Sequence, residues 1–372
     1  MIEWSESTIR SFRKTLLDWY DTYGRDLPWR WDHDPYHVWV SEIMLQQTQV
    51  NTVIPYYEHF MAEFPTVTDL ANAPEAKLMK AWEGLGYYSR ARNLQKAAKQ
   101  IVNERGGQWP QTAEGLQELA GIGPYTAGAI ASIAFNEPVP AVDGNAFRVF
   151  ARLLEIDLDI AKPQTRPVFE RVIGRIMSPD RPGDFNQAVM DLGASYMSAK
   201  NPDSAHSPVK AFNQAYLDGV EMQYPVKSKK PKPVKVAYYG LVIRHDDQFL
   251  MQKRPSDGLL ANFWTFPLIA EDDVLAMSET PELVTEEERL SLLEKLVQQE
   301  FGLTVRVIPM GGKPVKHTFT HRQWVITLLS AEVKPDADLS FFPGKWLSSD
   351  ELTRMALPKV QEKLLTRVHQ IQ

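Results

Sequence analysis

Cysteine is absent from this chain of 372 residues. Disulfides, thiolate zinc sites and iron–sulfur clusters bound through cysteine are therefore excluded. Positive charge is also scarce, because 41 Lys and Arg face 47 Asp and Glu, which gives a formal net charge of −6. The molecule as a whole is not a basic nucleic-acid clamp, so a DNA-binding surface would need locally clustered cations and backbone amides.

Long apolar runs are missing as well, and none approaches the length of a membrane span. The first ten residues are polar, with Glu3 and Glu6, and lack the basic start and apolar core of a signal peptide. We therefore expect a cytoplasmic protein with no membrane partner. The length and the 44% of hydrophobic residues suffice for two or three packed domains.

The chain changes character after about residue 220. Helical patterns dominate before it, whereas residues 224–235 carry three prolines among five lysines and predict a semi-extended linker. Alternating patterns then predict strands at 236–243, 248–254, 305–308 and 319–332 and helices at 283–301 and 348–368. The predicted fold is an all-α region followed by a small mixed α/β domain.

The most informative local pattern is Leu119-Ala-Gly-Ile-Gly-Pro-Tyr-Thr-Ala127. A first helix leads into Gly121 and Gly123, which allow a tight turn and a close backbone approach. Pro124 then opens an Ala-rich helix, whose free N-terminal amides favour a phosphate. A helix–loop–helix joint without a ligand is the alternative, but the full pattern resembles the helix–hairpin–helix of base-excision DNA glycosylases.

Two carboxylates stand in informative surroundings. Glu42 lies in an apolar helical stretch, residues 38–45, where burial would raise its pKa and suit a general acid. Asp143 precedes an expected helix, and could face a developing positive charge on a sugar. From the spacing alone, Glu42 could equally reach solvent and Asp143 could be a simple helix cap.

Further motifs run in order along nearly the whole chain: Trp29-Arg30, Pro35-Tyr36, and residues 39–50, 84–92, 142–148 and 319–321. Together they resemble the MutY family of adenine DNA glycosylases. The resemblance implies a helical glycosylase region at 1–220, a linker at 221–235 and a Nudix-like domain that reads oxidised guanine at 236–372. In the first region it implies a six-helix barrel with the hairpin at 113–134. The N-terminal helix and residues 137–220 would form the module that holds an iron–sulfur cluster in most relatives.

The implied reaction is hydrolysis of the bond between deoxyribose and adenine mispaired with 8-oxoguanine or guanine. Glu42 matches the acid that protonates the departing adenine and later activates water. Asp143 matches the carboxylate that stabilises, or bonds to, the sugar cation, and Asn145 would help to position it. Tyr125 stands where bifunctional relatives carry the lysine that forms a Schiff base, which predicts a glycosylase without lyase activity.

A base must leave the helix stack before it can be cut. The resemblance implies an adenine pocket formed by Trp29, Arg30 and Gln187, although Trp29 and Arg30 could also be a stacked structural pair. It assigns contacts with the duplex or the opposite base to Gln47, Thr48, Leu85, Tyr87, Tyr88, Gly121, Gly123, Phe319, Thr320 and His321. Core packing remains the alternative for one of the two tyrosines. The expected partner is double-stranded DNA near the nucleoid, bound by a monomer.

The chain departs from the family at the four cluster positions, which carry Met197, Ser204, Ser207 and Asn213. We therefore expect no iron–sulfur cluster and no other cofactor. The second domain keeps Glu300 but has Gln298 and Gln299 where a Nudix hydrolase needs acids, which disfavours nucleotide hydrolysis. Besides that activity, a bifunctional pyrimidine-lesion glycosylase/lyase and a non-catalytic lesion sensor are the alternatives.

Overall fold

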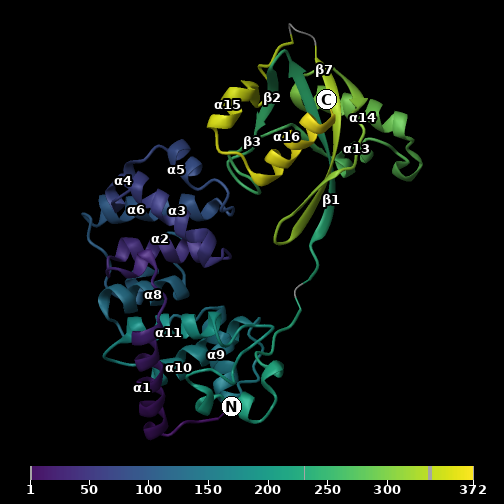
Figure 1. Cartoon of the computed structure of the whole chain (residues 1–372). Coiled ribbons are helices and arrows are strands. Elements are labelled where there is room, and N and C mark those ends of the chain that lie inside the picture. Colours follow the sequence, from purple (N-terminus) through teal and green to yellow (C-terminus); the bar gives the residue numbers. More distant parts are fainter. Residues whose placement is uncertain (1, 230, 334–336, 372) are drawn as a thin grey trace. The chain divides into compact units, whose positions relative to one another are not determined.

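A computed structural model describes residues 2–229, 231–333 and 337–371. The chain divides into two compact units, which are described separately (Figure 1). The first comprises Met1–Ala81 and Ser89–Lys229, and the second comprises Trp82–Tyr88 and Lys230–Gln372. Within the described residues, no helix has both the length and the apolarity needed to cross a membrane.

The first unit is built from helices, as the sequence predicts. They are α1 (Glu6–Tyr23), α2 (Pro35–Leu45), α3 (Val50–Glu63), α4 (Val67–Asn72), α5 (Glu75–Ala81), α6 (Ser89–Lys99), α7 (Ala113–Leu116), α8 (Pro124–Phe135), α9 (Gly144–Leu154), α10 (Arg166–Ile176), α11 (Pro182–Ala194) and α12 (Gln214–Leu217). Short turns of helix lie at Pro28–Arg30, Gln100–Glu104, Pro163–Thr165, Lys210–Phe212 and Glu221–Gln223.

The N-terminal helix joins residues that are distant in sequence. Ser5 caps α1 by accepting a hydrogen bond from the Thr8 amide, and the apolar stripe of α1 is buried. Phe12 of this stripe lies edge-on to Phe150 of α9 and Phe185 of α11, at ring distances of 6.4 and 6.3 Å. The first helix and the segment after residue 137 thus share one core.

The expected hairpin forms between α7 and α8. Helix α7 ends at Leu116, earlier than predicted, because the following amides bond to carbonyls only three residues back. Gly121 has a φ of +75°, and a Cβ there would lie 2.6 Å from Cβ of Asn93, so this position requires glycine. Gly123 has ordinary φ and open space around it, and it leads directly into Pro124 of α8.

The second unit contains a mixed sheet. Its strands are β1 (Val234–His245), β2 (Gln248–Lys253), β3 (Trp264–Thr265), β4 (Leu268–Ala270), β5 (Val305–Pro309), β6 (Val315–Thr318), β7 (Arg322–Val333) and β8 (Gly344–Ser348). Strand β1 runs parallel to β7, from Val234 opposite Arg322 to Ile243 opposite Ala331. Strands β5 and β6 pair antiparallel with β7, β2 and β4 pair antiparallel with β1, and β3 and β8 pair with β2.

Helices cover both faces of this sheet, since alternate residues of its central strands enter two different cores. Leu241 and Leu329 pack with α14 (Glu286–Phe301), next to α13 (Glu271–Leu275). Val242 and Leu328 pack with α15 (Ser349–Arg354) and α16 (Lys359–Ile371). The C-terminal third is therefore the mixed α/β domain that the sequence predicts.

Several predicted boundaries move for local reasons. The strand expected from residue 319 begins at Arg322, because the Phe319 amide donates to the Arg322 carbonyl and closes a turn between β6 and β7. The final helix is split before Pro358, whose ring disfavours helical backbone at the preceding residue.

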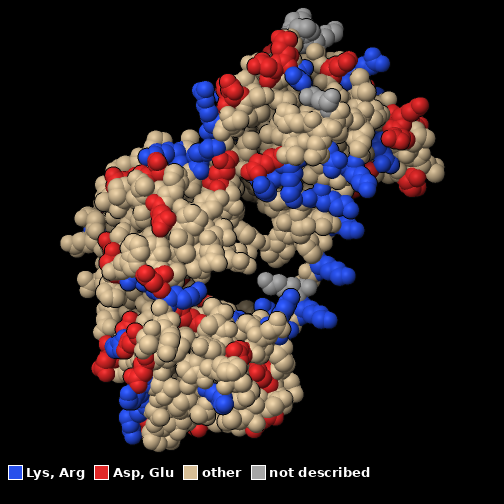
Figure 2. Space-filling view, in the orientation of Figure 1, with Lys and Arg blue, Asp and Glu red and all other residues tan. Residues whose placement is uncertain are grey.

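The expected linker at 221–235 is held at both ends. The Val226 carbonyl accepts a hydrogen bond from Ile160 and the Ser228 amide donates to Asp159, while Val234 opens β1. Lys230, within this linker, lies outside the described residues. In Figure 2, Lys and Arg gather in patches on the face shown, as expected if an acidic chain has local basic surfaces.

Candidate active site

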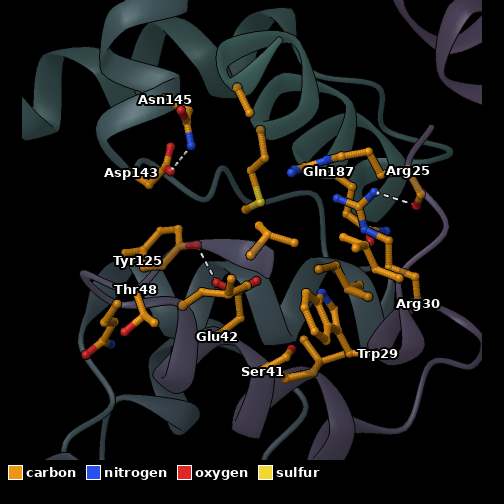
Figure 3. A pocket seen from close by; sticks show the side chains of 18 of the residues that line it. Arg25, Trp29, Arg30, Ser41, Glu42, Thr48, Tyr125, Asp143, Asn145 and Gln187 are labelled. Atoms are coloured by element: carbon orange, nitrogen blue, oxygen red, sulfur yellow. Dashed lines mark hydrogen bonds between the residues drawn. The ribbon is translucent and has the colours of Figure 1, made fainter. Parts of the chain in front are cut away.

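A cavity of about 490 Å³ lies within the first unit. Side chains from α2, α8, α9 and α11 and from the loops beside α2 line it (Figure 3). The predicted residues that it brings together are Trp29, Arg30, Glu42, Gln47, Thr48, Tyr125, Asp143, Asn145 and Gln187. Residues from both predicted carboxylate motifs thus meet in one concave site.

Glu42 lies on α2, which begins at Pro35 and is capped by the Asp34 carboxylate. Its side chain is 4% exposed, and it accepts a hydrogen bond from the Tyr125 hydroxyl on α8. Burial raises the pKa of Glu42 to about 7, although the Tyr125 hydrogen bond opposes the shift. The solvent-facing alternative for Glu42 is therefore wrong: the group is buried and can be protonated near neutral pH.

Asp143 is the N-cap of α9, so the simple structural interpretation of this residue is also met. Its carboxylate accepts hydrogen bonds from the Ala146 amide and the Asn145 side chain, both at 2.7 Å. Asn145 in turn accepts from Arg148 at 2.6 Å. Burial raises the pKa of Asp143, and these donors act against that rise.

Gly193 of α11 allows this helix to lie close to the Asn145 side chain. A Cβ at Gly193 would lie 2.7 Å from Cβ of Asn145. The guanidinium of Arg148 also donates to the carbonyls of Gly193 and Met197. We did not predict Arg148 as a site residue, and its place in the motif at 142–148 was the available signal.

On the opposite wall, Arg30 is held by a buried aspartate. Asp191 of α11 is 3% exposed and accepts two hydrogen bonds from Arg30, both at 2.9 Å. Arg25 donates to the same carboxylate through Nε at 2.8 Å and through its backbone amide. Burial favours the neutral acid, but the two guanidinium groups outweigh it and hold the pKa of Asp191 below its usual range. Neither Arg25 nor Asp191 is marked by any sequence motif quoted above.

Trp29 and Gln187 are buried in the cavity wall, with exposures of 5% and 6%. The ring of Trp29 lies edge-on to Tyr57 at 5.3 Å, whereas Arg30 lies over Tyr20 at 5.7 Å. The described ring contacts of Trp29 and Arg30 are therefore with Tyr57 and Tyr20, and not with each other as in the stacked pair considered above.

The turn after α2 carries Gln47 and Thr48. Gln47 has a φ of +61°, an uncommon conformation for a residue other than glycine and one often found at functional sites. Arg90 fixes this turn by donating to the carbonyls of Ile43 and Gln46, both at 2.7 Å. Arg90 was not predicted, although it lies in the motif at 84–92.

In the second unit, the two tyrosines of the segment Trp82–Tyr88 differ. Tyr87 is 49% exposed with a φ of +48°, and its hydroxyl lies 3.2 Å from that of Thr320. Tyr88 packs on Phe263 at a ring distance of 4.4 Å, and Leu85 is buried. Tyr88 and Leu85 are therefore packing residues in this structure, whereas the aromatic ring of Tyr87 is exposed to solvent.

The predicted triplet forms the turn between β6 and β7. Phe319 packs edge-on against Trp324 and His317, at 4.9 and 4.5 Å. Thr320 and His321 are exposed at the turn, and the His321 carbonyl accepts from the Val234 amide. Phe319 therefore anchors the turn, His321 is exposed, and the Thr320 hydroxyl is exposed but lies in hydrogen-bond distance of Tyr87.

Two of the four positions that lack cysteine, Ser204 and Asn213, form a buried polar cluster with Glu221. Met197, Ser204, Ser207 and Asn213 are all buried. Ser204 donates to Glu221, and Asn213 donates to Ser204 at 3.1 Å and to Glu221 at 3.3 Å. Tyr196 and Phe212 lie against the core that α1 shares with α9 and α11, and the ring of Phe212 is 5.4 Å from that of Phe12. Two hydroxyls, an amide and a thioether in place of four thiolates do not fit an iron–sulfur cluster, and Ser204 and Asn213 are already hydrogen-bonded to each other.

Comparison with known proteins defines the class. Residues 40–175 match the HhH-GPD superfamily of base excision DNA repair proteins, and residues 238–367 match the NUDIX domain. A thermostable thymine-DNA glycosylase shares the helical fold, with a TM-score of 0.51 and 24% identity over 57% of this chain and 98% of that chain. The fold and the site thus define a helix–hairpin–helix glycosylase of base excision repair that carries a Nudix-like domain.

Two curated relatives identify the family within this class. The adenine DNA glycosylase of Homo sapiens is 35% identical, over 97% of this chain and 74% of the human protein. That of Rattus norvegicus is 33% identical, over 96% of this chain and 77% of the rat protein. This chain belongs to the adenine DNA glycosylase family, as the sequence motifs predicted, and is an enzyme of base excision repair.

The first prediction concerns the ionisation of Glu42. Its carboxyl should titrate at about pH 7, and Tyr125→Phe should raise that pKa by about one unit, because a hydrogen bond to the charged form is lost. The measurement is a carbon-13 carboxyl titration by NMR, with Glu42→Gln identifying the signal. Since the folded pKa lies above the unfolded value of 4.5, Glu42 should favour folding at low pH and lose this contribution as pH rises through 7. An ordinary pKa would contradict the buried position.

The second prediction concerns the polar cluster. Asn213→Ala should lower the free energy of unfolding by about 1–3 kcal/mol, because Ser204 and Glu221 lose a buried donor. Urea denaturation measures this change, and the exposed Lys210→Ala serves as the control, expected to stay within about 0.5 kcal/mol. Equal stabilities for the two variants would show that the network does not hold the loop.

Proposed function

We propose that this enzyme excises adenine mispaired with 8-oxoguanine, without cleaving the DNA strand and without a metal cofactor. The observation that carries the proposal is the cavity that holds a buried, protonatable Glu42 together with Asp143. Glycoside cleavage commonly uses one carboxylic acid and one carboxylate in this way. Membership of the adenine DNA glycosylase family supplies the nature of the base.

In the proposed reaction, neutral Glu42 donates its proton to a ring nitrogen of adenine. The bond from the sugar to adenine breaks with its electron pair moving to the base, and the sugar becomes an oxocarbenium-like cation. Asp143, whose anionic form is favoured by hydrogen bonds from Ala146 and Asn145, stabilises that cation. Water then attacks the sugar carbon, and the Glu42 carboxylate takes its proton.

Tyr125 supports hydrolysis without strand cleavage. A lyase step needs an amine that can form a Schiff base with the sugar, and a phenol cannot do so. In this structure the Tyr125 hydroxyl instead donates to Glu42. We infer that Tyr125 orients the acid and limits the rise of its pKa.

A cavity of about 490 Å³ can accommodate a single extruded base. We infer that adenine enters between Trp29 and Gln187 on one side and Glu42 on the other. Arg30 is fixed by Asp191. It therefore shapes the pocket and adds positive charge, which helps to lower the pKa of Glu42.

For the opposite base, we propose that the turn after β6 discriminates 8-oxoguanine from guanine. Thr320 and His321 expose hydrogen-bonding side chains there, and Phe319 anchors the backbone between them and the core. The uncommon backbone of Gln47 and Tyr87 suits side chains that enter the duplex when a base is flipped out. The amides at Gly121–Gly123 and the start of α8 would hold a phosphate.

The third prediction tests the chemistry. Glu42→Gln should remove the proton donor and Asp143→Asn the countercharge, so each should abolish adenine release while duplex binding is largely kept. Single-turnover assays on an adenine:8-oxoguanine duplex measure release, and gel shifts measure binding. With the unmodified enzyme, strand breaks should appear only after alkali or heat. Release at near-native rates by either variant would instead favour a lesion sensor, and alkali-independent breaks would favour the bifunctional alternative.

The fourth prediction tests recognition. Thr320→Ala should reduce the preference for 8-oxoguanine over guanine opposite adenine by the worth of one hydrogen bond, about 0.5–1.5 kcal/mol. The ratio of single-turnover rates on the two duplexes measures this preference. Thr318→Ala, on the exposed end of β6, is the matched control. An unchanged ratio in Thr320→Ala would mean that the turn does not read the base.

A further inference from the structure

A second hollow, of about 670 Å³, lies between β6 and α16 in the second unit. Its lining is strongly basic, with five cations: Lys313, Lys316, Lys359, Lys363 and Arg367. Among the described lining residues, Glu362 is the one carboxylate. In a chain with a formal net charge of −6, this basic groove reverses the overall sign locally. Figure 2 shows Lys and Arg side chains gathered near α16.

The fold places these cations in a row. Helix α16 buries Val360, Leu364 and Val368 against the sheet, every fourth residue. The basic residues of α16 lie one position earlier in each repeat, on the face toward the groove. At 1.5 Å per residue, Lys359 to Arg367 spans about 12 Å, close to the rise of three to four nucleotides of one DNA strand.

One carboxylate and one carbonyl contact the cations of the groove. Glu362 pairs with Lys359 at 2.6 Å, and Nζ of Lys363 donates to the Lys316 carbonyl at 3.3 Å. Burial lowers the pKa of His317 on β6, and the charge of Lys363 lowers it further. With Lys359 paired to Glu362, the other four cations of the groove repel one another, and an anionic ligand would relieve that repulsion.

The groove is continuous with the turn that we propose to read the opposite base. Lys316 precedes Phe319 by three residues on the same extended segment, a distance of about 10 Å. Arg322, exposed at the start of β7, adds a cation on the other side of the turn. A ligand that contacts Thr320 and His321 could therefore reach the groove without any rearrangement of this unit.

We propose that this basic groove binds the phosphate backbone of duplex DNA. The inference rests on the proposed function, because it assumes that the turn after β6 contacts the same duplex. A protein partner would be expected to insert apolar or aromatic anchors, but the described lining offers no aromatic surface to receive them. A row of flexible ammonium groups instead suits repeated phosphates.

The test is the salt dependence of binding to a fully paired duplex without a lesion, measured by fluorescence anisotropy with the full-length chain. Lys363→Gln should reduce the slope of log K against log salt concentration by about one, and Lys316→Gln/Lys363→Gln by about two. At 0.1 M salt the double variant should bind at least about tenfold more weakly. Both side chains are exposed, so folding should be unaffected.

Lys295→Gln is the matched control, because it removes one exposed lysine from α14, whose apolar residues enter the other core. It should leave the slope unchanged. The proposal would be overturned if both groove variants gave the same slope as the unmodified protein. It would also be overturned if the variants lost binding to poly-glutamate as strongly as they lost binding to DNA, because the groove would then be a general site for acidic proteins. Adenine release from an adenine:8-oxoguanine duplex is assayed in parallel at low salt. Failure of the unmodified protein there would refute the proposed function, whereas altered slopes alone concern only the groove.

Discussion

The burial of one carboxyl group is the constraint on which the active site depends. Helix α2 is enclosed on nearly all sides, so Glu42 is separated from water and its neutral form is favoured. A buried acid without a partner would destabilise the fold, and the Tyr125 hydroxyl on α8 provides that partner. The hairpin leads directly into α8, and this helix brings Tyr125 to the acid. The same element therefore contains the hairpin for which we propose phosphate binding and the hydroxyl that contacts the proposed acid.

On the opposite side of the cavity, a buried carboxylate is kept ionised instead of neutral. Asp191 is as deeply buried as Glu42, but two guanidinium groups contact it and keep it ionised. Breaking such a pair is costly, since the remaining charge stays buried without compensation. The site therefore has one acid in the cavity whose neutral form is favoured, and a second acid, behind Arg25 and Arg30, that is held as an anion. Their difference arises from partners rather than from depth of burial.

The sequence predicted the two-part fold, the hairpin and nine of the residues that line the cavity, because each leaves a local pattern or a recognisable motif. It could not reveal Arg25, Asp191 or Glu221, which act through contacts across 166, 161 or 17 positions of the chain. Nor could it distinguish Tyr87 from Tyr88, since adjacent tyrosines look equivalent until the backbone directs one ring outward and the other onto Phe263. Short strands such as β3, which has two residues, are defined by their hydrogen bonds to a neighbouring strand. They contain too few residues to show an alternating pattern in the sequence.

The polar cluster at Ser204 and Asn213 shows how a fold can persist when a metal centre is not available. A cluster bound by thiolates would supply folding free energy through metal bonds. Here Glu221, from the segment that leads to the second unit, is drawn into the same loop by Ser204 and Asn213. Arg152 adds a further tie, because its guanidinium donates to the carbonyls of Ser198 and Tyr224. The loop is thus held by several individually modest bonds that engage the start of the linker. A change in the linker would therefore alter the hydrogen bonds that hold the loop. Four metal ligands that all lie within the loop would not couple the loop to the linker in this way.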